Sequence, residues 1–252
     1  MSAVLRQVRF TNKAFWRNPA SAFFTFAFPL LFLVIFTALL GGGEVTVQGT
    51  DLPQSTYFVV AMAAFGVISA CYTNIAMTTV FARDAGILKR LRGTPLPGGA
   101  YLGARVLHAV VVGGLLVLIT IAFGAVAYDA VLPTGISLVQ FVVSFLVGSL
   151  TFAALALAVA GAIPNADAAP PIVNATILPL LFISGIFIPL GDDAPAWMTT
   201  VADVFPVKHF AGAMLNSFLG LPFDWADVAI VAAWGIVGLV LATRTFTWEP
   251  RR

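Results

Sequence analysis

The chain has 252 residues, of which 60% are hydrophobic and 10% are charged, and its formal net charge is +2. A soluble domain is usually about 45–50% apolar and about 25% charged, so this composition excludes an ordinary water-soluble enzyme. High hydrophobicity with low net charge also excludes a disordered chain, and the single cysteine, Cys71, excludes a disulfide framework and a cysteine-rich metal site.

Residues 1–18 predict a basic amphipathic helix, because apolar and basic side chains fall on adjacent sides of a helical projection. The apolar side holds Val4, Leu5, Val8, Phe15 and Trp16, and the basic side holds Arg6, Arg9, Lys13 and Arg17. Such a helix lies in the membrane interface with its basic groups toward anionic lipid, so membrane lipid is an expected partner. The alternative is a flank that only orients the first span.

Six apolar stretches follow, none of which contains Asp, Glu, Lys or Arg. They cover residues 19–40, 57–81, 106–128, 137–163, 170–190 and, in the shortest case, 228–243. A helix needs about 20 apolar residues to cross the hydrocarbon core, and a charge at mid-bilayer costs about 2.5–3.5 kcal/mol on insertion scales. The sequence therefore predicts an all-α integral membrane protein with six transmembrane helices, formed as a single domain over residues 1–252.

The charged residues divide between the two sides of these spans. Twelve of the thirteen Lys and Arg residues precede the first span, follow the second or follow the last, and Lys208 is the exception. The intervening loops hold the acids Glu44, Asp51, Asp129, Asp192, Asp193, Asp203, Asp224 and Asp227. Because Lys and Arg favour the cytoplasmic side, we expect both termini in the cytoplasm.

The loop 83–105 predicts a short amphipathic helix at the cytoplasmic ends of two spans. Its apolar edge holds Ile87, Leu88 and Leu91, and its charges are Lys89, Arg90 and Arg92. Gly93, in a left-handed conformation, and Pro95 are expected to end it, and the turn 97–99 precedes the third span. A partner that grips this helix could move both adjacent spans; the alternative is a positive loop without a partner.

The run R-D-x-G-I-L-K-R-L-R-G-T-P-L, from Arg83 to Leu96, followed by Tyr101, Leu102 and Arg105, resembles the cytoplasmic loop of type-2 ATP-binding-cassette (ABC-2) permeases. One departure is Asp84, where family members often carry a glutamate. The resemblance implies that this loop is a coupling helix on a separate ATPase subunit, and that two permease subunits, identical or related, and two ATPase copies form the transporter. The residues it assigns to ATPase coupling are Arg83, Asp84, Gly86, Leu88, Lys89, Arg90, Leu91, Arg92, Thr94 and Pro95.

The chain is not expected to bind ATP itself. It has no Gly-x-x-x-x-Gly-Lys-Ser/Thr loop, and none of Lys13, Lys89 and Lys208 has that context. The resemblance places ATP and Mg on the partner ATPase. We expect no cofactor, metal or nucleic acid on this chain and no catalytic residues, because no Ser-His-Asp set or carboxylate pair lies on one element.

The external segment 191–227 predicts two short helices, within 195–222, that Pro206 separates. Phe205-Pro206 with His209-Phe210 resembles the family's Asn-Pro stretch, and the resemblance implies re-entrant helices, with Phe205, Pro206 and Phe210 as an external gate. The alternative is an external loop whose apolar side rests on the lipid surface.

Polar residues in two spans are candidates for the lining of the pathway. Asn74 and Thr78 belong to the second span, and Asn174 and Thr176 belong to the fifth. The resemblance to ABC-2 permeases implies that these two spans line the pathway. The more common role of such residues is to join helices by hydrogen bonds worth about 0.6 kcal/mol each.

Together with these features, the resemblance implies an exporter permease of the bacterial cell membrane. Its substrate is expected to be hydrophobic, amphiphilic or lipid-linked, and drug or antibiotic efflux is the favoured role. Export of polysaccharide or lipid-linked glycan is an alternative with the same layout. An ion-coupled secondary transporter is an alternative of another class, although the spans lack the acids that such carriers normally use.

Overall fold

The computed structural model describes residues 3–130, 132–189 and 194–249. The described chain is almost entirely helical, and one short β-hairpin is the only sheet within it. In chain order the elements are α1 (Ala3–Trp16), α2 (Pro19–Leu40), β1 (Glu44–Val47), β2 (Thr50–Pro53), α3 (Gln54–Ile68), the π-helical turn η1 (Ser69–Thr73), α4 (Asn74–Asp84), α5 (Ile87–Arg92), α6 (Gly98–Tyr128), α7 (Ile136–Ala162), α8 (Ala169–Ile183), α9 (Ala196–Val204), α10 (Pro206–Leu219) and α11 (Trp225–Thr245).

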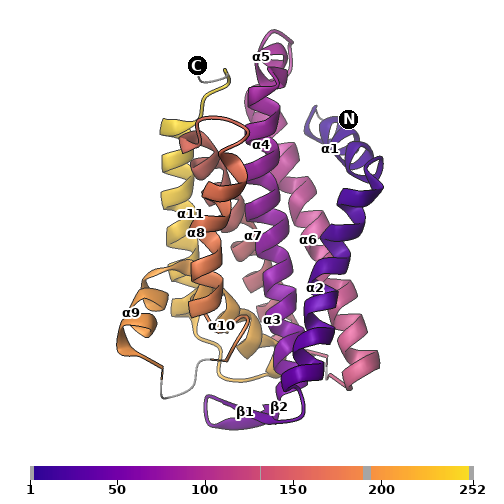
Figure 1. Ribbon diagram of the computed structural model, residues 1–252, viewed down its shortest axis with the longest axis vertical. Helices are drawn as coiled ribbons and strands as arrows, with labels where there is room; N and C mark the ends of the chain where they lie inside the picture. The colour runs from indigo at the N-terminus through magenta and orange to yellow at the C-terminus, as the bar shows by residue number, and fades with distance from the viewer. Residues whose placement is uncertain (1–2, 131, 190–193, 250–252) are drawn as a thin grey trace.

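Long parallel and antiparallel helices form a bundle (Figure 1). Five helical stretches in the described chain are long and apolar enough to cross a membrane: Ala22–Leu40 within α2, Gln54–Asp84 through α3, η1 and α4, then α6, α7 and α11. The protein is thus an all-α integral membrane protein, as predicted. The predicted helix at the N-terminus is also present as α1, with basic and apolar residues on different sides.

The fifth predicted span, residues 170–190, is shorter than expected. Its helix α8 has 15 residues and ends at Ile183, which gives about 22 Å at 1.5 Å per residue, less than the ~30 Å hydrocarbon core. The chain turns away at Gly185, whose φ of +83° is left-handed, and Tyr57 donates to the Gly185 carbonyl over 2.6 Å. Leu190 lies outside the described residues, and the count of six spans stays a prediction.

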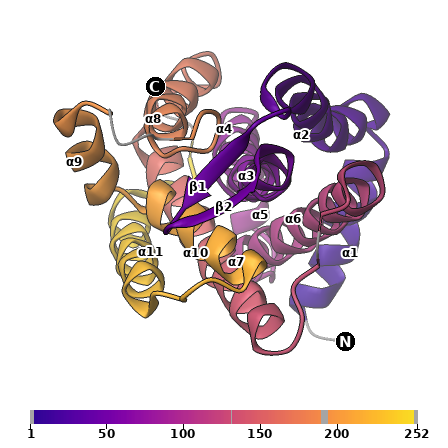
Figure 2. The ribbon, with the colours of Figure 1, turned by 90° about the horizontal axis from the view of Figure 1, so that it is seen from below.

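The second span lies at the centre of the bundle. Of its most apolar window 83% is buried, against 11% for α2 and 22% for α11, and Figure 2 shows α3 surrounded by other helices. Phe58, Met62 and Ile68 are fully buried there. The outer helices instead expose apolar side chains, as expected of surfaces that face lipid.

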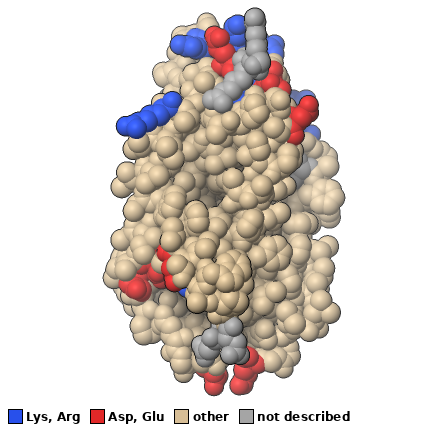
Figure 3. Space-filling view, turned by 60° about the vertical axis from the view of Figure 1, so that its left-hand side comes forward, with Lys and Arg blue, Asp and Glu red and all other residues tan. Residues whose placement is uncertain are grey.

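The two ends of the bundle differ in their elements and charge. Both described termini and α5 lie at one end, and the hairpin and α10 lie at the other (Figure 1). Lys and Arg gather at the α5 end, together with some acids, and the middle of the molecule is largely uncharged (Figure 3). Of the residues used in the sequence-based charge count, Asp192, Asp193, Arg251 and Arg252 lie outside the described residues.

The sequence-based interpretation missed the hairpin β1–β2, which it treated as a loop. Glu44 pairs with Pro53 and Val47 with Thr50. Gln48 and Gly49 have φ of +50° and +76°, as a two-residue type I′ turn requires. The hairpin lies across the end of the bundle (Figure 2).

Two expectations about the loop 83–105 were wrong. Gly93 has φ of −80°, and the left-handed glycine is Gly86, with φ of +70°, because the sharp reversal occurs before the short helix and not after it. The turn predicted at 97–99 does not separate loop from span either, since α6 begins at Gly98, directly after Pro97.

Candidate functional site

The second span carries the coupling-loop helix away from the bundle. It is helical from Gln54 to Asp84, a run of 31 residues, and about 46 Å long at 1.5 Å per residue, so it exceeds a ~30 Å hydrocarbon core. Gly86 then reverses the chain into α5, which projects furthest at this end of the molecule (Figure 1). The short helix α5 is therefore joined to a central helix of the bundle by only two residues, Ala85 and Gly86.

Arg83, at the end of α4, is buried and holds the end of α7. Its side chain is 2% exposed. The guanidinium donates to the carbonyl of Ala160 over 2.9 Å, to that of Ile163, and to that of Pro164 over 3.4 Å. The last carbonyls of a helix have no partner within the helix, and a cation there is favoured by the helix dipole.

Arg83 is one of the residues predicted to take part in ATPase coupling. Because its side chain is buried and engaged with three carbonyls, it does not reach the surface of this chain, and its coupling role stays a prediction. Asp84 makes a second contact between α4 and the residues after α7, because its carboxylate accepts a hydrogen bond from the Ala166 amide over 3.1 Å. Together they fasten the end of α4 to the α7–α8 connection.

The helix α5 presents its cations outward. Lys89, Arg90 and Arg92 are exposed, and so are Thr94 and Pro95. Arg90 donates back to the carbonyl of Ala85 over 3.2 Å. These exposed residues are a part of the predicted coupling set that a partner could reach.

The apolar side of α5 seats it on the bundle. Leu88 is fully buried and packs with Ala82 and Tyr101, with Leu91 against the same cluster. Ile87, predicted to share this edge, is 45% exposed, because neighbouring residues of a helix point about 100° apart and Leu88 is the one that faces the cluster. Leu88 and Leu91 therefore position the helix, and the neighbouring cations are left free for contact.

The four predicted pathway residues occupy two places. Asn74 and Thr78 line a cavity of about 480 Å³ between α1, α4, α5 and α6. Thr176 on α8 lies 2.7 Å from the hydroxyl of Tyr72 in η1, so it joins two helices, and Asn174 is half-buried on α8. The structure does not bring the four together, and their pathway role stays a prediction.

The predicted gate residues anchor α10 to the bundle. Phe205 stacks on Trp234 of α11 with ring centroids 5.5 Å apart, and Pro206 begins α10. Phe210 is 1% exposed and meets Phe152 of α7 edge-on at 5.2 Å. The helices α9 and α10 are the two short helices that were predicted on either side of Pro206. The gating role and the re-entrant course stay predictions.

Residues 4–219 match the ABC-2 type transporter family. The chain belongs to this family. The match runs from α1 through α10 and so includes the predicted coupling loop, the cavity beneath α1 and the predicted gate. Members of the family are transport subunits of ABC transporters, which also contain an ATPase partner.

Two curated proteins illustrate the relationship. The chain is 23% identical over 249 residues to YvfS of Bacillus subtilis (strain 168), provisionally named a transport permease, and the match covers 96% of each chain. It is 30% identical over 237 residues to the daunorubicin resistance ABC transporter permease protein DrrB1 of Streptomyces coeruleorubidus, covering 92% of this chain and 80% of the relative.

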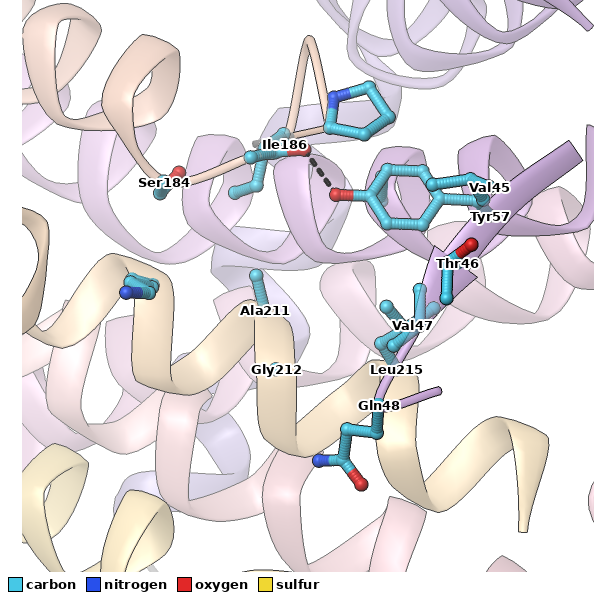
Figure 4. Close-up of a pocket in the computed structure, with 14 residues that line it drawn as sticks. Val45, Thr46, Val47, Gln48, Tyr57, Ser184, Ile186, Ala211, Gly212 and Leu215 are labelled. Carbon is cyan, nitrogen blue, oxygen red and sulfur yellow. Dashed lines mark hydrogen bonds between the residues drawn. The ribbon is translucent and has the colours of Figure 1, made fainter. Parts of the chain in front are cut away.

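A second cavity of this ABC-2 permease lies at the hairpin end. It measures about 270 Å³, and the hairpin, α3, the turn after α8 and α10 line it. Figure 4 shows Tyr57 reaching across it to the turn that contains Ser184 and Ile186, while Ala211, Gly212 and Leu215 form the opposite wall. The hairpin therefore forms one wall of this cavity, a role that the sequence-based interpretation did not give it.

His209 links three elements of the permease near this cavity. Its Nδ1 lies 2.6 Å from Oδ1 of Asp227 on α11, and its Nε2 lies 2.8 Å from the carbonyl oxygen of Asp203 on α9. Lys208 pairs with the carboxylate of Asp203. The spacing of these residues in sequence gave no signal of this cluster, because Asp227 approaches only when α11 packs beside α10. Among the described residues no group of three or more His, Cys, Asp or Glu side chains is arranged to hold a metal ion.

Proposed function

We propose that this permease exports a hydrophobic or amphiphilic compound across the bacterial cell membrane, with energy from ATP and Mg bound by a separate ATPase subunit. Both termini and α5 would then face the cytoplasm, and the hairpin would face outward. Two ATPase copies and a second permease subunit would complete the transporter.

The observation that carries this proposal is the arrangement of α5. Three exposed cations stand on a helix whose buried side is fixed by Leu88, and the helix follows directly from the central span. A partner that binds these cations could displace the span as a lever. The distribution of Lys and Arg supports placing this end in the cytoplasm.

The substrate class rests on the apolar spans and on a relative. The six predicted membrane-crossing stretches contain no Asp, Glu, Lys or Arg, which suits an apolar or amphiphilic substrate better than a charged one. DrrB1 is named for daunorubicin resistance, and this favours drug efflux over glycan export for the present chain.

The triple charge reversal K89E/R90E/R92E tests the proposal. We expect normal membrane insertion, because these side chains are exposed, but loss of daunorubicin efflux from cells and loss of the coupling between ATP hydrolysis and transport in the purified complex. R244E, which reverses an exposed cation at the same end on α11, is the control and should leave efflux intact. Wild-type efflux by the triple variant, or efflux by the isolated permease under a proton gradient alone, would refute the proposed coupling.

A further inference from the structure

The cavity between α1 and the bundle contains a cation and several polar groups. Arg105 of α6 lines it, together with Asn74 and Thr78 of α4, Gln7 of α1, and Asn18 in the connection between α1 and α2. Its volume of about 480 Å³ is ample for a phosphate-bearing headgroup, since ligand cavities usually start at about 300 Å³.

The charge of Arg105 is not paired with a carboxylate. Its guanidinium donates to the Tyr101 hydroxyl over 2.6 Å and to the Thr78 hydroxyl, and both of these partners are neutral. The guanidinium carbon also lies 5.5 Å from the centre of the Tyr101 ring. Within the described part of the chain, neither ion pair with an Asp or Glu involves Arg105.

The surroundings of the cavity are also positive. The first 43 residues contain no Asp or Glu and contain four Lys and Arg residues, and α1, which covers the cavity, comes from this segment. Asp84, the acid nearest to Arg105 in sequence, accepts from the Ala166 amide. The cavity therefore favours an anion, which a guanidinium binds through two parallel hydrogen bonds.

The helix α1 indicates where this anion comes from. Leu5, Phe10 and Trp16 are 52%, 61% and 51% exposed, alongside the exposed cations Arg6, Arg9 and Lys13. A helix with these two kinds of exposed side chain lies in the plane of the membrane interface. A cavity beneath it is at the depth of lipid phosphates, and Phe10 and Phe15 in its lining suit the glycerol and the first acyl carbons.

We propose that this cavity binds the phosphate group of an anionic phospholipid, held by Arg105 and the polar side chains around it. The headgroup completes the pairing of the Arg105 charge and fills the space between α1 and the bundle. Because Ile87 and Leu91 of α5 also line the cavity, the lipid contacts the coupling-loop helix from behind. The binding itself does not depend on the proposed transport function.

The test measures the lipid that stays bound to the purified permease. Protein is reconstituted with equal amounts of phosphatidylglycerol and phosphatidylcholine, washed in detergent, and examined by native mass spectrometry. Wild type should retain phosphatidylglycerol preferentially, and R105Q should retain about tenfold less, as expected for the loss of a direct charge-assisted contact to the phosphate. T78D, which keeps Arg105 but places a carboxylate beside it, should reduce retention similarly and covers the case in which R105Q fails to fold.

The control is R9Q, which removes the same charge from an exposed position on α1 outside the cavity and should retain lipid as wild type does. If R9Q and R105Q lost equal amounts of bound lipid, the retention would be due to diffuse attraction by surface charge, and the proposed site would be refuted. Unchanged retention in both R105Q and T78D would also overturn it. Displacement of the lipid by millimolar glycerol 3-phosphate would instead assign the cavity to a soluble phosphate compound.

Discussion

Arg83 acts where the end of one helix meets the end of another. Its guanidinium joins three backbone carbonyls at the end of α7, and so it holds the base of the coupling loop without taking part in the exposed surface. A buried carbonyl that loses its donor costs about 1–3 kcal/mol, so the side chain has a large effect on stability.

We expect R83M to lower the free energy of unfolding by about 2–3 kcal/mol, since methionine fills the space but leaves the carbonyls unsatisfied. The stability of R83K should lie between those of R83M and wild type, because one ammonium group replaces only some of the N–H donors of the guanidinium. The thermal unfolding of the detergent-purified protein measures this loss of stability. The control is R92Q, a substitution of an exposed arginine on α5. If R83M and R92Q unfolded at the same temperature, Arg83 would not have the capping role assigned to it.

At the scale of the elements, close helix contacts decide where α10 lies. Gly148 of α7 faces the ring of Phe210, and a Cβ added there would lie 2.1 Å from that ring. The small residue lets the aromatic side chain enter between the helices, as small residues commonly do in membrane bundles.

G148A should therefore destabilise the protein by about 1–3 kcal/mol, the usual cost of an overpacked contact. The double variant G148A/F210L should recover part of this loss, because the smaller side chain removes the clash; the cycle of single and double variants isolates the coupling. The control is G103A on α6, where an added Cβ meets nothing within 4 Å and alanine should stabilise by up to about 1 kcal/mol. Equal thermal stability of G148A and G103A would contradict this packing.

At the scale of the whole molecule, the chain is a bundle with the predicted coupling loop at one end and the hairpin at the other. Glu44 lies on β1 and Lys89 on α5, and both are exposed. The native Cys71 is buried, so cysteines introduced at these two positions report the orientation without interference from it.

E44C should react with a membrane-impermeant maleimide in intact cells, and K89C should react only after the membrane is permeabilised. The physical reason is the preference of Lys and Arg for the cytoplasmic side. The reverse pattern of labelling would invert the orientation, and labelling of both in intact cells would place them on the same side.

The sequence by itself determined the membrane class, the approximate position of the main spans, the basic N-terminal helix and the division of charge along the chain, because these depend on local composition and on the cost of burying charge in hydrocarbon. It also placed Lys89, Arg90 and Arg92 on a short helix, since Ile87, Leu88 and Leu91 have helical spacing.

Only the tertiary structure decided which of these residues are available to a partner or a ligand. Arg83 is indistinguishable in sequence from the exposed arginines after it, and the end of α7, about 80 positions away, makes it a buried cap. Thr78 becomes the neighbour of Arg105, and His209 that of Asp227, through packing of distant segments. Such pairings depend on how helices cross and not on the spacing along any one of them, and for that reason local patterns do not contain them.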